Sequence, residues 1–184
     1  QESAIYTKNN DLNMVKIHGK ELSYNNYNDI FSALVITKTL PKNRGTVIVK
    51  HTNPCGVSIL KNNLDSYKAA LACDPISAFG GIVSCNFKIN LKIASELNKI
   101  FLEVIIANGF DNDALKILKL KKNLRLIDST NYFSNEILKF NSFDNSFLIQ
   151  SDDNKEFKKK DFKVVSKRKP TKTQFDNLIF AFNV

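Results

Sequence analysis

Two adjacent residues, Lys50 and His51, bring an amine and an imidazole together at one point of the chain. They follow a β-branched segment, residues 46–49, which favours a short buried strand. Turn-forming residues, the Asn-Pro-Cys-Gly sequence, come directly after Thr52. The pair is therefore predicted at the carboxyl end of a strand, the edge at which ligands bind in open α/β sheets.

The chemistry available to this pair is acid–base catalysis. A neutral imidazole can accept a proton near neutral pH, and an ammonium group beside it can stabilise developing negative charge. The spacing is equally compatible with a capping lysine and a structural histidine, and both interpretations stay open at this point. The other histidine, His18, precedes a glycine and is interpreted as a turn or surface residue.

The elements that must position this pair alternate along the chain. Asn28 or Asp29 is predicted to cap the first helix, which ends before Pro41. The alternation predicts an α/β fold, a mostly parallel mixed sheet with helices on both faces. Helices are predicted near residues 30–38, 64–73, 90–100, 112–121 and 175–182, and strands near residues 46–49, 82–85, 103–107, 124–127, 147–150 and 162–165.

The charge of the chain comes almost entirely from lysine. The formal net charge is +9, yet only three residues are arginine. Planar, bidentate reading of bases and phosphates favours arginine, and no run of aromatic residues accompanies the lysine-rich residues 155–169. We therefore interpret the charge as a solvated surface and expect no nucleic-acid partner.

Cysteine and hydropathy patterns exclude further classes of protein. The three cysteines form no Cys-X-X-Cys motif, and the two histidines complete no zinc pattern, so we expect no metal site. An odd number of cysteines without a disulfide framework fits a reducing compartment. The apolar segments are short and interrupted by charge, so neither a membrane span nor a signal peptide is expected. The expected location is the cytoplasm.

Five stretches, taken together and in order, carry a resemblance to a known family. The sequence resembles the transformylase half of the bifunctional enzyme AICAR transformylase/IMP cyclohydrolase. The ordered set covers nearly the whole chain, and its second and third members are long and specific. The stretches are residues 19–26 (GKELSYNN), 49–56 (VKHTNPCG), 74–83 (DPISAFGGIV), 101–107 with the Ala-Leu pair at 114–115, and 164–171 (VVSKRKPT).

This resemblance implies a fold similar to that of cytidine deaminases, without their zinc chemistry. It also implies a reaction in purine (IMP) biosynthesis. The formyl group of the co-substrate 10-formyltetrahydrofolate passes to the 5-amino group of AICAR ribonucleotide, giving FAICAR and tetrahydrofolate. On the family motif, His51 is the general base, and Lys50 stabilises charge or supplies the proton for the leaving group.

The resemblance also implies a set of substrate-binding residues. Asn26 matches a nucleotide-binding asparagine in the loop before the first helix, while Phe79 and Gly80 match the pair that lines the base. Glu103 aligns with an acidic position in the pocket. Structural alternatives stay open: a helix cap at Asn28, a core position for Phe79, and an acid at Glu103 that needs a partner.

The resemblance implies a partial domain over residues 1–184. The first subdomain is expected at about residues 15–128, and the start of the connection to the second at about 129–184. The cyclohydrolase domain, the second subdomain and a phosphate-binding arginine are expected to be missing, together with any monovalent-cation site. The apolar face near 175–182 would then need a packing partner.

The family's active site lies at a homodimer interface and takes residues from both chains. The fragment alone is therefore predicted to show little or no turnover. Two alternatives stay open: a basic nucleotide- or nucleic-acid-binding α/β module without chemistry, and an inactive relic of the enzyme.

Overall fold

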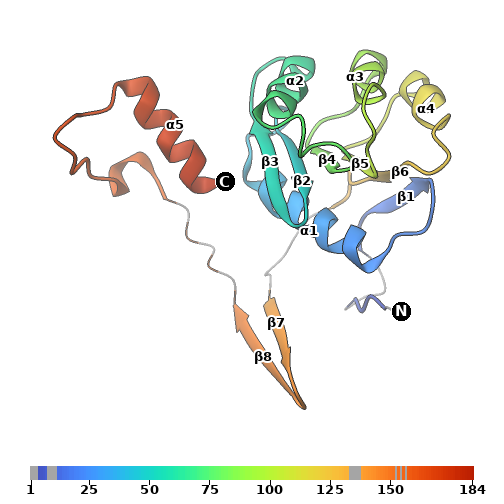
Figure 1. Cartoon of the computed structure of the whole chain (residues 1–184), viewed down its shortest axis with the longest axis horizontal. Coiled ribbons are helices and arrows are strands. Elements are labelled where there is room, and N and C mark those ends of the chain that lie inside the picture. Colours follow the sequence, from blue (N-terminus) through green and yellow to red (C-terminus); the bar gives the residue numbers. More distant parts are fainter. Residues whose placement is uncertain (1–3, 8–11, 133–137, 152, 154, 156) are drawn as a thin grey trace. The chain divides into compact units, whose positions relative to one another are not determined.

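The computed structural model describes residues 4–7, 12–132, 138–151, 153, 155 and 157–184 of the chain. The chain divides into two compact units, Gln1–Tyr132 and Phe133–Val184 (Figure 1). The first unit contains β1 (Val15–His18), α1 (Tyr24–Thr39), β2 (Thr46–Lys50), β3 (Asn53–Ser58), α2 (Asn63–Cys73), β4 (Ile82–Cys85), α3 (Leu91–Leu97), β5 (Val104–Ala107), α4 (Asn112–Leu118) and β6 (Arg125–Asp128). The second contains β7 (Leu138–Phe143), β8 (Ser146–Ser151), the short 3₁₀ helix η1 (Lys159–Asp161) and α5 (Lys172–Asn183).

Among the described residues of the first unit, six strands form one sheet in the order β1-β6-β5-β4-β2-β3. The pairs β4–β5 and β5–β6 are parallel, while β1–β6, β2–β4 and β2–β3 are antiparallel. Strands β3, β4, β5 and β6 therefore run in one direction, and β1 and β2 run in the other. The predicted mixed sheet, with most strands in one direction, is confirmed.

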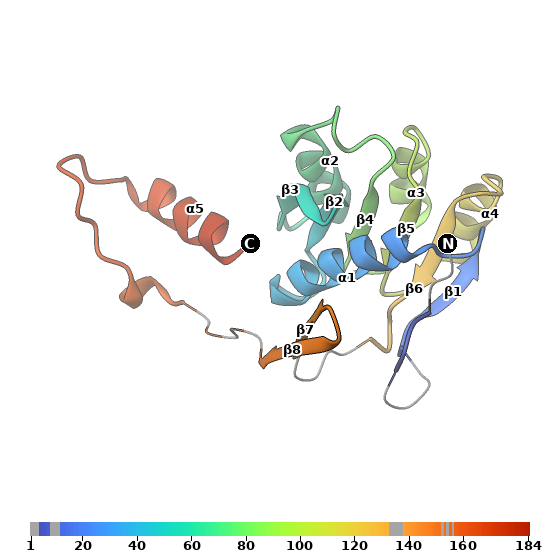
Figure 2. The same cartoon turned by 60° about the horizontal axis from the view of Figure 1, so that its bottom comes forward.

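Helices cover both faces of this sheet, as predicted (Figures 1 and 2). Helix α1 packs on one face, where the hydroxyls of Thr37 and Ser84 are hydrogen bonded at 2.8 Å. Helices α2, α3 and α4 lie on the other face, over the main hydrophobic core. Alternate strand residues such as Ile48, Val83 and Ile105 belong to that core, because successive side chains of a strand point to opposite faces.

Two predicted element boundaries near the candidate site are wrong. Residues 53–56, expected to form a turn, begin strand β3, so the turn is confined to His51 and Thr52. Helix α1 begins at Tyr24, earlier than expected, because the Ser23 side chain caps it. Asn28 and Asp29 therefore lie inside the helix and do not cap it.

Other differences concern segments of weak periodicity. The predicted strand at 162–165 is wrong, because in the described part of the chain these residues follow η1 without forming a strand. Strand β1 was not predicted, since only a brief apolar signal marks it, and it is held by antiparallel pairing with β6. The predicted strand at 147–150 is confirmed as part of β8, whose partner β7 was not predicted.

The second unit consists of a β-hairpin and a helical segment. All described residues of β7 and β8 are exposed. Helix α5 was predicted from its apolar spacing, and none of its residues, all of which the structure describes, is buried. Three rings, those of Phe157, Phe162 and Phe182, contact one another with centroids 5.2 to 6.1 Å apart. Within the described residues, no helix is both long and apolar enough to cross a membrane.

Candidate functional site

The candidate residues gather at one edge of the sheet. Strand β2 is antiparallel to β4, so its carboxyl end lies beside the amino ends of β4, β5 and β6. In this row Val49 pairs with Ile82, Ile82 with Val104, and Val104 with Arg125. Lys50 ends β2, so the prediction that the pair lies at the carboxyl end of a strand is confirmed. The comparison with the carboxyl edge of open parallel sheets does not hold, because β2 runs antiparallel to β4.

Lys50 and His51 lie where the β2–β3 hairpin turns. Lys50 pairs with Asn53 across a two-residue turn, and His51 and Thr52 adopt left-handed backbone conformations with φ of 52° and 61°. The Lys50 amine donates a hydrogen bond of 2.7 Å to the carbonyl oxygen of Phe79. His51 is exposed, so its imidazole is accessible from solvent.

A loop, residues 74–81, brings a ring and a glycine to the Lys50 amine. The backbone N–H of Gly80 donates to the carbonyl of Phe101 at 2.9 Å, and the Gly80 φ is +74°. The ring of Phe79 lies 5.4 Å from that of Phe101 and is 59% exposed. A core position for Phe79 is therefore wrong, and its ring is free to stack on a planar ligand.

The start of this loop is fixed by Asp74. Its carboxylate accepts hydrogen bonds from the Ser77 backbone N–H at 2.9 Å and from the Ser77 hydroxyl at 2.6 Å. These bonds hold the pKa of Asp74 below its ordinary value, because they favour the ionised carboxylate. The loop that carries Phe79 and Gly80 is therefore shaped by a local side-chain turn.

Asn26 lies in the first turn of α1 and not, as expected, in the loop before it. Its Oδ1 accepts from the Ser23 backbone N–H at 3.1 Å, and its own N–H donates to the Ser23 hydroxyl at 3.2 Å, which forms a capping box. Its Nδ2 donates to Glu103 Oε2 at 2.8 Å. Asn26 is therefore part of the helix cap and also contacts Glu103. Its Oδ1 can accept one further hydrogen bond, and its Nδ2 can donate one more.

Arg125 is a member of this site that sequence reasoning missed. Its NH1 lies 3.8 Å from Glu103 Oε2, and its Nε donates to the Glu21 carbonyl at 3.1 Å. The Arg125 side chain is only 15% exposed, while that of Glu103 is 43% exposed. The sequence held a signal for this residue. Glu103 stands at the start of one predicted buried strand, and Arg125 stands at the start of the next, so an ion pair between them could have been predicted.

Cys55 occupies the β-bulge behind the hairpin turn. Strand β2 pairs Ile48 with Gly56 and Val49 with Pro54, which leaves Cys55 as the extra residue. Burial raises the pKa of the Cys55 thiol, and Asp74 raises it further, while Lys50 acts in the opposite direction. The thiol therefore stays protonated near neutral pH and serves as packing beside the reactive pair.

The edge thus presents an amine, an imidazole, a carboxylate, an amide and an exposed ring. Among the described residues, no group of three or more His, Cys, Asp and Glu side chains lies close enough to hold a metal ion. The donors and acceptors present can bind a planar, polar molecule and move protons on it. Lys50, His51, Asn26, Phe79, Gly80 and Glu103 are thus brought to one edge. His18 ends β1 at the far side of the same edge, where it pairs with Leu126 and its Nε2 lies 3.2 Å from the Lys121 carbonyl.

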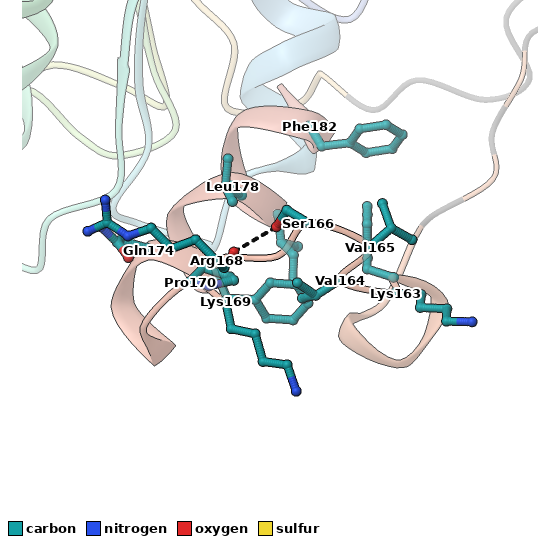
Figure 3. Close-up of a pocket in the computed structure, with 13 residues that line it drawn as sticks. Lys163, Val164, Val165, Ser166, Arg168, Lys169, Pro170, Gln174, Leu178 and Phe182 are labelled. Atoms are coloured by element: carbon teal, nitrogen blue, oxygen red, sulfur yellow. Dashed lines mark hydrogen bonds between the residues drawn. The ribbon is translucent and has the colours of Figure 1, made fainter.

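The second unit contains a separate apolar pocket of about 770 Å³, drawn in Figure 3. Leu178 and Phe182 of α5 face Val164 across it, and the Ser166 hydroxyl donates to the Arg168 carbonyl at 2.7 Å at one end. None of the candidate residues lines this pocket. Its walls are mostly apolar and offer no acid–base pair, so we do not assign chemistry to it.

Comparison with known proteins agrees with the family resemblance that the five sequence stretches carry. The family model described as the AICARFT/IMPCHase bienzyme matches residues 1–184. A bifunctional purine biosynthesis protein PurH of Ruminiclostridium cellulolyticum is 41% identical over an alignment of 173 residues that covers 92% of this chain and 34% of that protein. The protein of the same name from Caulobacter vibrioides is 39% identical over 193 residues, covering 100% of this chain and 36% of the relative. This chain thus spans about a third of the length of these relatives.

Proposed function

The chain belongs to the AICARFT/IMPCHase bienzyme family, and we propose that it contributes to the formyl-transfer site of purine biosynthesis. The proposed reaction is transfer of the formyl group of 10-formyltetrahydrofolate to the 5-amino group of AICAR ribonucleotide, which gives FAICAR and tetrahydrofolate. The observation that carries the proposal is the Lys50–His51 turn at one sheet edge, where the Lys50 amine bonds to the carbonyl of Phe79, a residue whose ring is 59% exposed.

The chemistry of the reaction matches the groups at this edge. The acceptor amine is a poor nucleophile, so a base must remove a proton as the new C–N bond forms. We assign this role to His51. The tetrahedral intermediate carries an oxyanion and the folate nitrogen must be protonated to leave, and we assign charge stabilisation or proton donation to Lys50.

The remaining residues are proposed to bind the nucleotide. Phe79 offers its exposed ring for stacking, and Gly80 allows a close approach of the backbone. Asn26 and Glu103 offer one amide and one carboxylate to the polar substituents of the imidazole carboxamide. The partly exposed Glu103 carboxylate is accessible to a ligand as well as to Asn26.

The proposal extends to partners that the family resemblance implies. We propose a cytoplasmic homodimer with a shared active site, which binds AICAR ribonucleotide and folate and does not bind nucleic acid. A monovalent cation, if one is used, would belong to parts of the family's domain outside these residues. The subdomain boundary near residue 128 stays a prediction.

The decisive experiment replaces the proposed catalytic pair in the complete gene product. Lys50→Ala and His51→Ala should each lower the rate of formyl transfer by about 100-fold or more, because each removes a proton-transfer or charge-stabilising group. His18→Ala is the matched control and should retain the rate, since His18 lies on β1, separated from β2 by three strands of the sheet, and the bond described for its ring is to the Lys121 carbonyl. Unimpaired formylation in both alanine variants would rule out the proposal.

A second experiment tests the 184-residue chain by itself. We expect little or no formyl transfer from this chain, because the proposed site needs groups from a partner subunit and from further parts of the domain. Turnover equal to that of the complete gene product would contradict this expectation. Polynucleotide binding that falls steeply with salt would instead favour the basic binding module.

A further inference from the structure

The turn that carries His51 has an unusual backbone. Both central residues of the two-residue β2–β3 hairpin, His51 and Thr52, have positive φ, at 52° and 61°. Asn-Gly and Asp-Gly are the usual sequences for such a turn, because asparagine and glycine tolerate this region. A β-branched threonine there is a steric outlier, and such a conformation persists only where the surrounding structure holds it.

A carboxylate from another element holds this turn. Asp29 Oδ1 accepts a hydrogen bond of 2.7 Å from the backbone N–H of Thr52. Asp29 lies on α1, 23 positions earlier in the chain. The Thr52 hydroxyl bonds locally to the His51 carbonyl at 2.7 Å, so the contact that ties the turn to the rest of the unit is the one from Asp29.

Asp29 does not serve α1 as a cap. Ser23 and Asn26 already form the capping box of that helix. Asn26 and Asp29 are three positions apart and therefore neighbours on the helix surface. One contacts Glu103 and the other contacts Thr52, so the start of α1 joins β5 to the β2–β3 hairpin.

We propose that Asp29 is a positioning residue, which fixes the strained His51–Thr52 turn so that the imidazole of His51 and the amine of Lys50 face the bound nucleotide. The catalytic part of this statement rests on the proposed function. The physical reason is that a charge-assisted hydrogen bond to a backbone N–H favours the left-handed conformation of Thr52 over the extended alternatives. A displacement of about 1 Å at the reacting groups can cost on the order of 100-fold in rate.

The test is a rescue experiment in the complete gene product. Asp29→Ala should lower kcat for formyl transfer by about 10- to 100-fold, with little change in KM for AICAR ribonucleotide. The double variant Asp29→Ala/Thr52→Gly should recover most of the lost kcat, because glycine adopts positive φ without steric cost. Asp29→Asn keeps an acceptor oxygen and should stay close to the unmodified rate. Asp65→Ala, which removes an exposed acid from the first turn of α2, is the matched control.

Rescue distinguishes positioning from direct contact. If Asp29 touched the substrate, Thr52→Gly would not restore the rate, and absence of rescue would overturn the proposal. An unchanged kcat in Asp29→Ala would overturn it as well.

Hydrogen exchange tests the contact without reference to activity. In the unmodified 184-residue chain, the amide of Thr52 should exchange at least about 10-fold more slowly than a free peptide, although it lies at an exposed turn. Exchange at the free rate would overturn the proposal even if Asp29→Ala failed to fold. Conversely, protection of Thr52 in this chain, together with a complete gene product that transfers no formyl group, would refute the proposed function and leave the positioning contact standing.

Discussion

Asn26 and Glu103, which are 77 positions apart, are joined by a hydrogen bond of 2.8 Å from Nδ2 to Oε2. The bond connects the first turn of α1 to the residue before β5, at the edge where Lys50 and His51 lie. Asn26 is almost fully buried, at 5% exposed, whereas the carboxylate of Glu103 remains partly open to solvent. The helix cap and the proposed nucleotide pocket therefore depend on the same side chain.

Replacement of Asn26 should accordingly have two effects. Asn26→Ala removes one side of the capping box and the hydrogen bond to Glu103, so the free energy of unfolding should fall by about 1–2 kcal/mol. Affinity for AICAR ribonucleotide should fall as well. Urea unfolding and nucleotide titration measure the two effects. Asn28→Ala in the same helix is the control, and equal losses in both variants would contradict the special role of Asn26.

Gly80 and Gly109 offer a matched pair of glycine substitutions. Both have positive φ, +74° and +92°, and in each a Cβ would meet its nearest atom at 3.5 Å. Alanine at either position should destabilise the chain by about 1 kcal/mol through the backbone. Only Gly80→Ala should weaken nucleotide binding, because Gly80 lies beside Phe101 and the Lys50 amine. Equal nucleotide affinity in the two variants would argue against a binding role for Gly80.

Arg125 is expected to act on binding more than on stability. Arg125→Met keeps an apolar stem and removes the guanidinium that lies 3.8 Å from Glu103. Because the Glu103 carboxylate is partly exposed, the ion pair should contribute less than about 1 kcal/mol to folding. We expect KM for AICAR ribonucleotide in the complete gene product to rise by about 10-fold, since Glu103 loses a group that orients it. Arg44→Met is the control, and the same KM in both variants would refute this prediction.

Stability should decrease in alkaline solution. Burial raises the pKa of the Cys85 thiol from 9.0 to about 12, and burial also raises the pKa of Tyr67. Both groups hold their protons in the folded chain at a pH where the unfolded chain loses them. The contribution of these protonated groups to the free energy of unfolding is therefore complete below about pH 9, and it is lost as the pH rises towards 12. The loss should approach about 1.4 kcal/mol per pH unit for each group.

Urea unfolding between pH 8 and pH 11 measures this slope. Burial lowers the pKa of Lys121, which acts in the opposite sense, so the comparison between variants isolates the thiol. Cys85→Ala should flatten the alkaline decline, whereas Cys73→Ala, which removes an exposed thiol, should leave it unchanged. An identical decline in the Cys85 variant would show that the buried thiol does not cause it.

The sequence by itself predicted the class of fold and the candidate site residues. β-Branched and apolar segments predicted the strands β2, β4, β5 and β6, because buried strands need such side chains whatever their neighbours are. The ordered motifs identified the family, and they singled out Lys50, His51 and Glu103 as residues of one site. The strands needed only local composition and spacing, whereas the site residues came from the resemblance of the motifs to the family.

The tertiary structure alone decided the direction of β2 and the partners of the polar side chains. Whether β2 runs parallel or antiparallel to β4 depends on long-range pairing, and this pairing moved the site to the amino ends of β4 to β6. The bonds from Asn26 to Glu103 and from Thr52 to Asp29 join residues 77 and 23 positions apart. Local propensity carries no information on such contacts, because they form only when the helix and the sheet have packed.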